Sequence, residues 1–408
     1  MNYSVHTFPN GLRVIHLPSD SPVSYCGLGI KAGARNESAE EFGLAHFVEH
    51  MLFKGTEKRK AWHILNRMEN VGGELNAFTS KEETFVYSVF PAECFHRAYE
   101  LLTDIVFNSK FPQNEIEKET EVILDEINSY KDNPSELIFD EFENILFRNH
   151  ALGHNILGDE TTLMHFNTES AASFTRRWYY PANMIFFSMG NIAFSRIIRM
   201  LEDVPDRTDM TPPLCPDDSP GTFAGGYERI NRNTHQAHVI IGGRSYGMFE
   251  NKNKRTALIL LNNLLGGPGM NSRLNLSLRE KNGLAYSVES NLTAYTDTGM
   301  ASIYFGTNAK SVDRALGLAR KELEKLRSVK LSDLQLSAIK KQLSGQMRVG
   351  MENRENLFLH AGKYFLHHNR YYTLADRIAG IEKVTGEEIL AAANEIFSPD
   401  DLYTLVYE

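Results

Sequence analysis

Two histidines and a glutamate fall within five residues near the start of the chain, in the run HFVEH at positions 46–50. The apolar spacing of residues 43–53 predicts a helix, and residues four apart on a helix lie one above the other. His46 and His50 can therefore hold one metal ion, with Glu49 on the same side. Imidazole suits Zn²⁺, and a carboxylate beside a zinc-bound water can take its proton. The run predicts a hydrolytic zinc site, in the inverted order of the HExxH motif. A purely structural His/Glu cluster is the alternative for the bare pattern.

Such a site needs a third ligand, and the helix predicted over 114–131 offers carboxylates. Glu119 and Glu126 are seven apart, so they share a helix face beside the apolar run 122–124. A carboxylate on an inward face needs a partner, because burying it alone is costly. Three further glutamates, at 115, 117 and 121, also lie on this helix. Spacing alone therefore leaves open whether Glu119 and Glu126 are ligands or part of a solvated stripe.

Strand and helix signals alternate through the first half of the chain. Predicted strands cover 12–17, 24–30, 74–79, 84–90 and 184–189, and predicted helices include 43–53, 61–71, 91–106, 114–131 and 134–146. Prolines then gather among Asp, Ser and Thr between about 206 and 226, which is a linker composition. We therefore predict a domain over 1–208, a linker over 209–225 and a second domain over 226–408.

The two halves share an order of elements. Strand 84–90 and the helices 92–106 and 115–127 are matched by strand 300–305 and the helices 311–326 and 334–343, at an offset of roughly 215–220 residues. We predict an α+β protein with two similar domains related by internal duplication, each a mostly antiparallel sheet packed with helices. Chance similarity between α+β domains is the alternative. The second half has no HxxEH run.

Composition narrows the class of protein. The formal net charge of −9 argues against a nucleic-acid-binding surface. No apolar run approaches the ~20 residues of a membrane helix, and the first residues lack the pattern of a signal peptide. Cys26, Cys94 and Cys215 have no metal-ligand spacing and indicate idle thiols in a reducing compartment. We expect a soluble cytoplasmic protein that binds neither nucleic acid nor membrane.

Four motifs resemble the pitrilysin, insulinase and mitochondrial processing peptidase family. They are GLAHFVEHMLFKGT (43–56), GGELNAFTSKEETFVYSV (72–89), EKETEVILDEI (117–127) and NSRLNLSLREKNGLAYSVES (271–290). The resemblance spans both halves in order, and the chain length is most similar to the short-chain processing-peptidase branch. It implies that His46, His50 and Glu126 bind one Zn²⁺ per chain, with Glu126 at the family's spacing of 76 residues beyond His50. It also implies that Glu49 is the general base and that Glu119 orients a ligating histidine.

The resemblance also assigns residues to substrate. Asn76 and Ala77 would lie on an edge strand that pairs with the substrate backbone, which agrees with the template that an unpaired edge offers. Phe53 would line the pocket for the residue after the cut, with plain core packing as the alternative. Glu82 and Glu83 could favour a basic substrate residue nearby, or they could simply be solvated.

In the second half, Arg279 and Tyr286 match the family's Arg/Tyr pair. The implied role is to hold substrate and help the oxyanion, with Tyr286 donating a hydrogen bond. Without the resemblance, Arg279 would be interpreted as a surface charge and Tyr286 as a half-buried aromatic residue. The run 266–269, Gly-Gly-Pro-Gly, resembles a shortened glycine-rich loop of the processing peptidases. A turn between helices is its alternative reading.

The implied activity is that of a zinc-dependent endopeptidase acting on peptides or unfolded segments inside an enclosed chamber. Family members build the chamber from four such domains, whereas this chain has two. We therefore expect a homodimer in which Arg279 and Tyr286 of one subunit face the zinc of the other. A non-catalytic scaffold subunit and a peptide-binding module with a structural zinc are the two alternatives. A structural zinc usually has four protein ligands, and three are named here.

Overall fold

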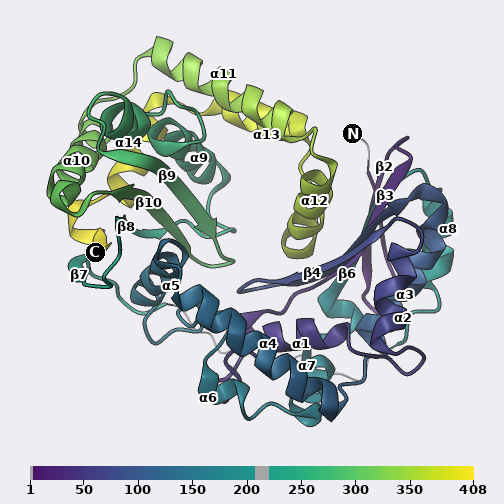
Figure 1. Ribbon diagram of the computed structural model, residues 1–408. Helices are drawn as coiled ribbons and strands as arrows, with labels where there is room; N and C mark the ends of the chain where they lie inside the picture. The colour runs from purple at the N-terminus through teal and green to yellow at the C-terminus, as the bar shows by residue number, and fades with distance from the viewer. Residues whose placement is uncertain (1–2, 207–219) are drawn as a thin grey trace. The chain divides into compact units, whose positions relative to one another are not determined.

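The computed structural model of the protein describes residues 3–206 and 220–408 (Figure 1). These residues form two compact units, each built round its own sheet. Within the described ranges, the first unit comprises 3–128, 154–206 and 351–373, and the second comprises 129–153, 220–350 and 374–408. The predicted α+β class with two similar domains is confirmed.

The sheet of the first unit has six strands in the order β1-β2-β6-β3-β5-β4. The strands are β1 (Ser4–Thr7), β2 (Arg13–Pro18), β3 (Val23–Ile30), β4 (Glu74–Thr79), β5 (Thr84–Pro91) and β6 (Met184–Gly190). β2 and β6 run parallel, and every other neighbouring pair runs antiparallel. β4 pairs only with β5 among the described strands, so it is an edge of the sheet.

Helices cover both faces of this sheet. Its own half of the chain supplies α1 (Leu44–Leu52), α2 (Ala61–Glu69), α3 (Phe95–Phe107), α4 (Gln113–Lys131), α6 (Glu160–Leu163), α7 (Thr168–Trp178) and α8 (Phe194–Leu201). Alternate strand residues such as Leu28 and Val86 pack in one core with α1, α3, α4, α7 and α8. The intervening residues, such as Phe85 and Phe187, pack against α12 (Arg354–His368) on the opposite face.

The second unit repeats this plan, but its sheet has no counterpart of β1 among the described strands. Its sheet order is β7-β11-β8-β10-β9, with β7 (Gly226–Ile230), β8 (Ala237–Ser245), β9 (Ala285–Ala294), β10 (Gly299–Thr307) and β11 (Tyr403–Tyr407). β11 runs parallel to β7 on one side and antiparallel to β8 on the other. In the first sheet, β6 likewise runs parallel to β2 and antiparallel to β3. Because the two sheets share strand order and direction, their topology supports the predicted duplication.

The helices of the second unit are α5 (Pro134–Leu146), α9 (Lys252–Gly266), α10 (Val312–Ser328), α11 (Asp333–Gly350), α13 (Leu374–Lys383) and α14 (Gly386–Ile396). One face of the sheet packs in a core with α9, α10 and α14, and the other packs with α5. α5 comes from the first half of the chain, just as α12 of the first unit comes from the second half.

This exchange departs from the contiguous boundaries predicted at 1–208 and 226–408. Each sheet has two apolar faces, and helices from its own half cover only one of them. A helix from the other half covers the remaining face in both units. Most of the predicted linker, 209–225, lies outside the described residues, as does Cys215.

An acidic side chain of the β4–β5 turn holds α12 on the first sheet. Glu83 forms an ion pair with Lys363, and it accepts a hydrogen bond from Nε2 of His367 at 2.9 Å. Burial opposes ionisation of Glu83, but His367 and Lys363 outweigh it and lower the pKa of the carboxyl to about 2. Glu82 pairs with Arg35 at 2.8 Å. Both carboxylates are buried and paired within the chain, so neither is a solvated side chain.

Candidate active site

The helix α1 separates its apolar and polar residues as the sequence predicts. Leu44, Phe47, Val48, Met51 and Leu52 are fully buried in the main core. Burying each large side chain of this kind contributes roughly 1.5–3 kcal/mol, which fixes the rotation of the helix. The face that carries His46, Glu49 and His50 then lies beside α4. α1 also packs on β4.

The first turn of α1 is held by a carboxylate that lies six residues before the N-cap residue, Gly43. Gly43 precedes the helix at φ 94°, and an added Cβ would lie 2.6 Å from the carbonyl oxygen of Leu157. Glycine has no side chain to cap the helix. Instead, the carboxylate of Glu37 accepts hydrogen bonds from the backbone N–H of Gly43 at 2.9 Å and of Ala45 at 2.6 Å. Nε2 of His154 lies 2.9 Å from the same carboxylate.

Glu37 and His154 form a buried pair whose charged forms are disfavoured. Burial raises the pKa of the Glu37 carboxyl well above its usual value, although the backbone N–H groups oppose this. Burial also lowers the pKa of His154 to about 4, with a further contribution from Lys81. Burial therefore disfavours the charged form of each partner, and the Glu37 oxygens still accept from the helix backbone.

Substituting Glu37→Gln should destabilise the first unit by about 1–3 kcal/mol, because the amide NH₂ would face one of the two buried backbone donors. Thermal unfolding followed by circular dichroism would show a lowered melting temperature. Glu40→Gln, an exposed carboxylate nearby, is the matched control and should melt like the parent. Equal melting of the two variants would contradict a capping role for Glu37.

Ligand atoms of His46, His50 and Glu126 converge beside α1, all within 4.8 Å of one another. Oε2 of Glu126 lies 3.9 Å from Nε2 of His46 and 3.7 Å from Nε2 of His50. Two atoms bound to one zinc at ~2.0–2.1 Å can be at most about 4.2 Å apart, and both distances satisfy that limit. Glu126 therefore lies close enough to each histidine to share one zinc ion with it.

The imidazole of His50 is held with its Nε2 atom available to a metal. Nδ1 of His50 lies 3.0 Å from Oε2 of Glu119, and Lys54 pairs with the other oxygen of that carboxylate. A histidine held in this way through Nδ1 presents the lone pair of Nε2 to a metal. Burial, together with the charge of His50, lowers the pKa of His46 to about 3, so His46 is neutral at pH 7 as a ligand must be. Burial lowers the pKa of His50, but Glu119, Glu49 and Glu126 raise it on balance.

Glu49 lies beside the metal group without belonging to it. Its carboxyl interacts with the side chain and backbone of Thr79, the last residue of β4. Burial raises the pKa of Glu49, and the hydrogen bonds with Thr79 partly offset this rise. Thr79 therefore holds the carboxyl of Glu49 at the end of the edge strand.

Two of the residues predicted to meet substrate on the first unit lie on this edge strand. Asn76 is registered with Tyr87 and Ala77 with Val86, both on β5, which leaves the other edge of β4 without a strand among the described residues. Phe53 ends α1, is half-buried and packs against the main core. That contact is the one expected from core packing.

Arg279 and Tyr286 come together on the second unit. The guanidinium of Arg279 lies 5.8 Å from the ring centre of Tyr286, and Tyr286 is 83% exposed. The interpretation of Tyr286 as a half-buried aromatic residue is therefore wrong. Arg279 belongs to η5 (Asn275–Glu280), a π-helical turn, and such turns are frequent at functional sites. Both residues line a cavity of about 600 Å³ together with Gly266, Gly267 and Pro268.

Comparison with known proteins identifies the family. Residues 13–160 match the family described as insulinase, peptidase family M16, and residues 165–343 match the peptidase M16 inactive domain. An uncharacterized zinc protease of Bacillus subtilis, YmxG, is 32% identical over 98% of this chain and 97% of its own length. A zinc protease of Streptomyces coelicolor, also uncharacterized, is 32% identical over 96% and 86%. The chain belongs to peptidase family M16.

Solved structures share the M16 fold at lower sequence identity. A peptidase M16 inactive domain from Pseudomonas fluorescens superposes with a TM-score of 0.91 at 20% identity, covering 100% of this chain and 98% of its own. A protease from Helicobacter pylori gives a TM-score of 0.91 at 21% identity, covering 100% and 99%. Among the described residues, no helix combines the length and apolar character needed to cross a membrane.

Three supporting residues of this M16 peptidase site escaped the sequence prediction. Thr79 and Lys54 act through contacts between elements that are distant along the chain, whereas Glu37 contacts the start of α1 only six and eight residues away. Glu37 carried one local signal, because a glycine before a helix leaves the cap to another side chain. Thr79 and Lys54 carried no signal that distinguishes them from surface residues.

Proposed function

We propose that this M16 peptidase is a zinc-dependent endopeptidase that cleaves extended peptides or unfolded segments. The single observation that carries the proposal is the convergence of His46, His50 and Glu126 beside Glu49, next to an open strand edge. The curated relatives named above are zinc proteases. The chain is accordingly a zinc metalloprotease.

His46, His50 and Glu126 would hold one zinc ion, with Glu119 fixing the ring of His50. Bound zinc supplies a Lewis acid that polarises the scissile carbonyl and lowers the pKa of a water. Glu49 takes the proton from the attacking water and then delivers a proton to the leaving amine. Thr79 keeps that carboxylate aimed at the reacting water. Lys54 forms an ion pair with Glu119. Glu49, and not Lys54, is therefore the residue proposed to transfer the proton.

Substrate would bind as an added strand on β4. Asn76 and Ala77 offer backbone groups along the edge, and this pairing selects an extended chain over a folded one. Phe53 is proposed to border the pocket for the residue after the cut. On the second unit, the exposed Tyr286 would donate a hydrogen bond to the developing oxyanion while Arg279 holds the substrate, with the Gly266–Pro268 loop lining the same cavity.

The alternative of a purely structural zinc is not supported by the donor set. Among the described residues, one group of His, Cys, Asp or Glu side chains converges closely enough to hold a metal ion, and it has three members. Structural zinc sites are almost always four-coordinate through protein ligands, whereas three ligands leave a position for water. A non-catalytic scaffold subunit is disfavoured because Glu49 is present and held in place.

The proposal is tested by measuring bound zinc and the cleavage of a mixed peptide library before and after chelation. Zinc-loaded protein that cleaves none of the library would overturn it.

We further propose a homodimer that encloses the substrate and shares its active sites. The test is a dimer of two differently tagged chains, one Glu49→Gln and one Tyr286→Phe, purified through both tags. If Tyr286 serves the zinc of its partner, one site of each mixed dimer has both defects and the other has neither. Such dimers should recover about half of the parental activity, because a two-fold dimer has two equivalent sites.

Each variant dimer made of one chain type is the matched control and should remain nearly inactive. Mixed dimers as inactive as these controls would contradict shared sites. Failure to recover any doubly tagged protein would contradict the dimer itself, and the proposal for the zinc site would stand unaffected.

A further inference from the structure

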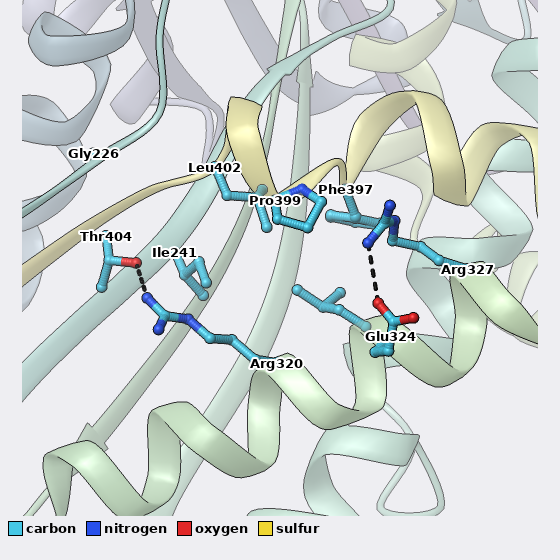
Figure 2. A pocket seen from close by; sticks show the side chains of 10 residues that line it. Gly226, Ile241, Arg320, Glu324, Arg327, Phe397, Pro399, Leu402 and Thr404 are labelled. Atoms are coloured by element: carbon cyan, nitrogen blue, oxygen red, sulfur yellow. Dashed lines mark hydrogen bonds and ion pairs between the residues drawn. The ribbon is translucent and has the colours of Figure 1, made fainter.

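A second cavity of the second unit shares no lining residue with the one beside Arg279. It has a volume of about 500 Å³ and lies between α10 and the strands β8 and β11 (Figure 2). Its walls include the apolar side chains of Ile241, Leu323, Phe397, Pro399 and Leu402. Ligand pockets for small molecules typically have volumes of about 300–1,000 Å³ and mostly apolar walls with few polar groups. Size and lining therefore suit a small organic molecule.

One end of this cavity carries a positive charge that the protein does not neutralise. Arg320 donates a hydrogen bond from Nη2 to Oγ1 of Thr404 at 3.3 Å, and Thr404 is almost completely buried. In the described part of the chain, no carboxylate pairs with Arg320. A guanidinium has five N–H donors in a fork that matches a carboxylate, so most of its hydrogen-bonding capacity remains available. The hydroxyl hydrogen of Thr404 is a further donor beside it.

The opposite end of the cavity is electrically balanced. Arg327 lies seven residues after Arg320 on α10, so the two share a helix face. Nη1 of Arg327 lies 3.1 Å from Oε2 of Glu324, and the two charges compensate each other. Figure 2 shows Arg320 and Thr404 on one side, Arg327 and Glu324 on the other, and Leu402 and Pro399 between them. The cavity thus has one cationic end and an apolar floor.

We propose that this cavity binds a small monocarboxylic acid with an apolar body. The carboxylate would receive paired hydrogen bonds from the guanidinium of Arg320 and a third from the Thr404 hydroxyl. The apolar body would cover Ile241, Leu323 and Leu402 and end against the Arg327–Glu324 pair. None of these residues belongs to the zinc site, so the proposal is independent of the peptidase mechanism.

Isothermal titration of the full-length, zinc-loaded protein with octanoate tests the proposal. Octanoate should bind with one site per chain, and octan-1-ol and octylamine should bind at least about tenfold more weakly, because a charged hydrogen-bond partner is lost. Arg320→Gln should weaken octanoate binding by at least about tenfold for the same reason. Lys321→Gln removes an equal charge from the next position of α10, outside the cavity, and should leave binding unchanged.

Thr404→Val gives a second variant of nearly unchanged shape, and it should also weaken octanoate while sparing octan-1-ol. Melting temperatures equal to that of the parent would show that the variants are folded. The proposal is overturned by the absence of saturable octanoate binding, by equal affinity for octanoate and octan-1-ol, or by equal effects of Arg320→Gln and Lys321→Gln. Binding that persists in the metal-free protein would confirm its independence from the zinc site, and binding lost with the metal would contradict that independence.

Discussion

Replacing Glu49 with glutamine should leave zinc bound and lower peptide cleavage by about 10²–10⁴-fold, the usual contribution of a general acid–base group. Glutamine matches the size of glutamate but cannot accept the proton of the attacking water. Glu49 is not part of the converging group of His46, His50 and Glu126, so its charge is not needed to hold the metal. The measurement combines zinc content by atomic absorption with kcat/KM on a cleavable peptide.

The position of Glu49 makes this result specific. Its carboxyl is oriented by Thr79, and glutamine can keep a hydrogen bond to the same residue. The loss should therefore appear in kcat, with KM for the peptide changed little. Glu69→Gln, an exposed carboxylate at the end of α2, is the matched control and should retain full activity. Substantial cleavage by Glu49→Gln would remove Glu49 from the mechanism, and loss of zinc would make it a ligand instead.

The sequence predicted the parts of the site that follow from periodicity within single helices. The spacing of His46, Glu49 and His50 on α1 placed them on one face, and the apolar residues of that helix are buried as the pattern required. The identity of the third ligand could not follow from spacing. Five glutamates lie on α4. The rotation of α4 against α1 determines that Glu126 approaches both imidazoles and that Glu119 contacts Nδ1 of His50.

The fold shows the same division between local and long-range information. The strands and helices near the site were predicted within a few residues, because alternation and helical spacing are local patterns. The exchange of α5 and α12 between the two units was not predicted. The sequence of an amphipathic helix indicates that the helix covers an apolar face, but it does not specify which sheet supplies that face. The pairing of Glu83 with Lys363 and His367 depends on that exchange and was equally inaccessible.

Glu126→Gln and Glu119→Gln should separate a metal ligand from a residue that orients one. Glu119 contacts Nδ1 of His50 and lies on the far side of the ring from the converging Nε2 atoms. Its loss should weaken zinc binding by about 10–100-fold, because His50 would be less firmly oriented and less basic. Glu126→Gln removes one of three ligands together with its negative charge. We expect a larger loss, on the order of 10³-fold or more, since zinc needs a deprotonated carboxylate there.

Competition for zinc against a chromogenic chelator measures both affinities, and circular dichroism checks that α4 is retained. Glu121→Gln is the matched control, because Glu121 is exposed on the same helix and lies outside the metal group. The order expected is parent equal to Glu121→Gln, then Glu119→Gln, then Glu126→Gln. A reversed order of the last two would make Glu119 the ligand and would require α4 to turn on its axis when zinc binds. Equal, small losses would mean that the two histidines hold the metal with ligands other than these glutamates, which the converging geometry of Glu126 argues against.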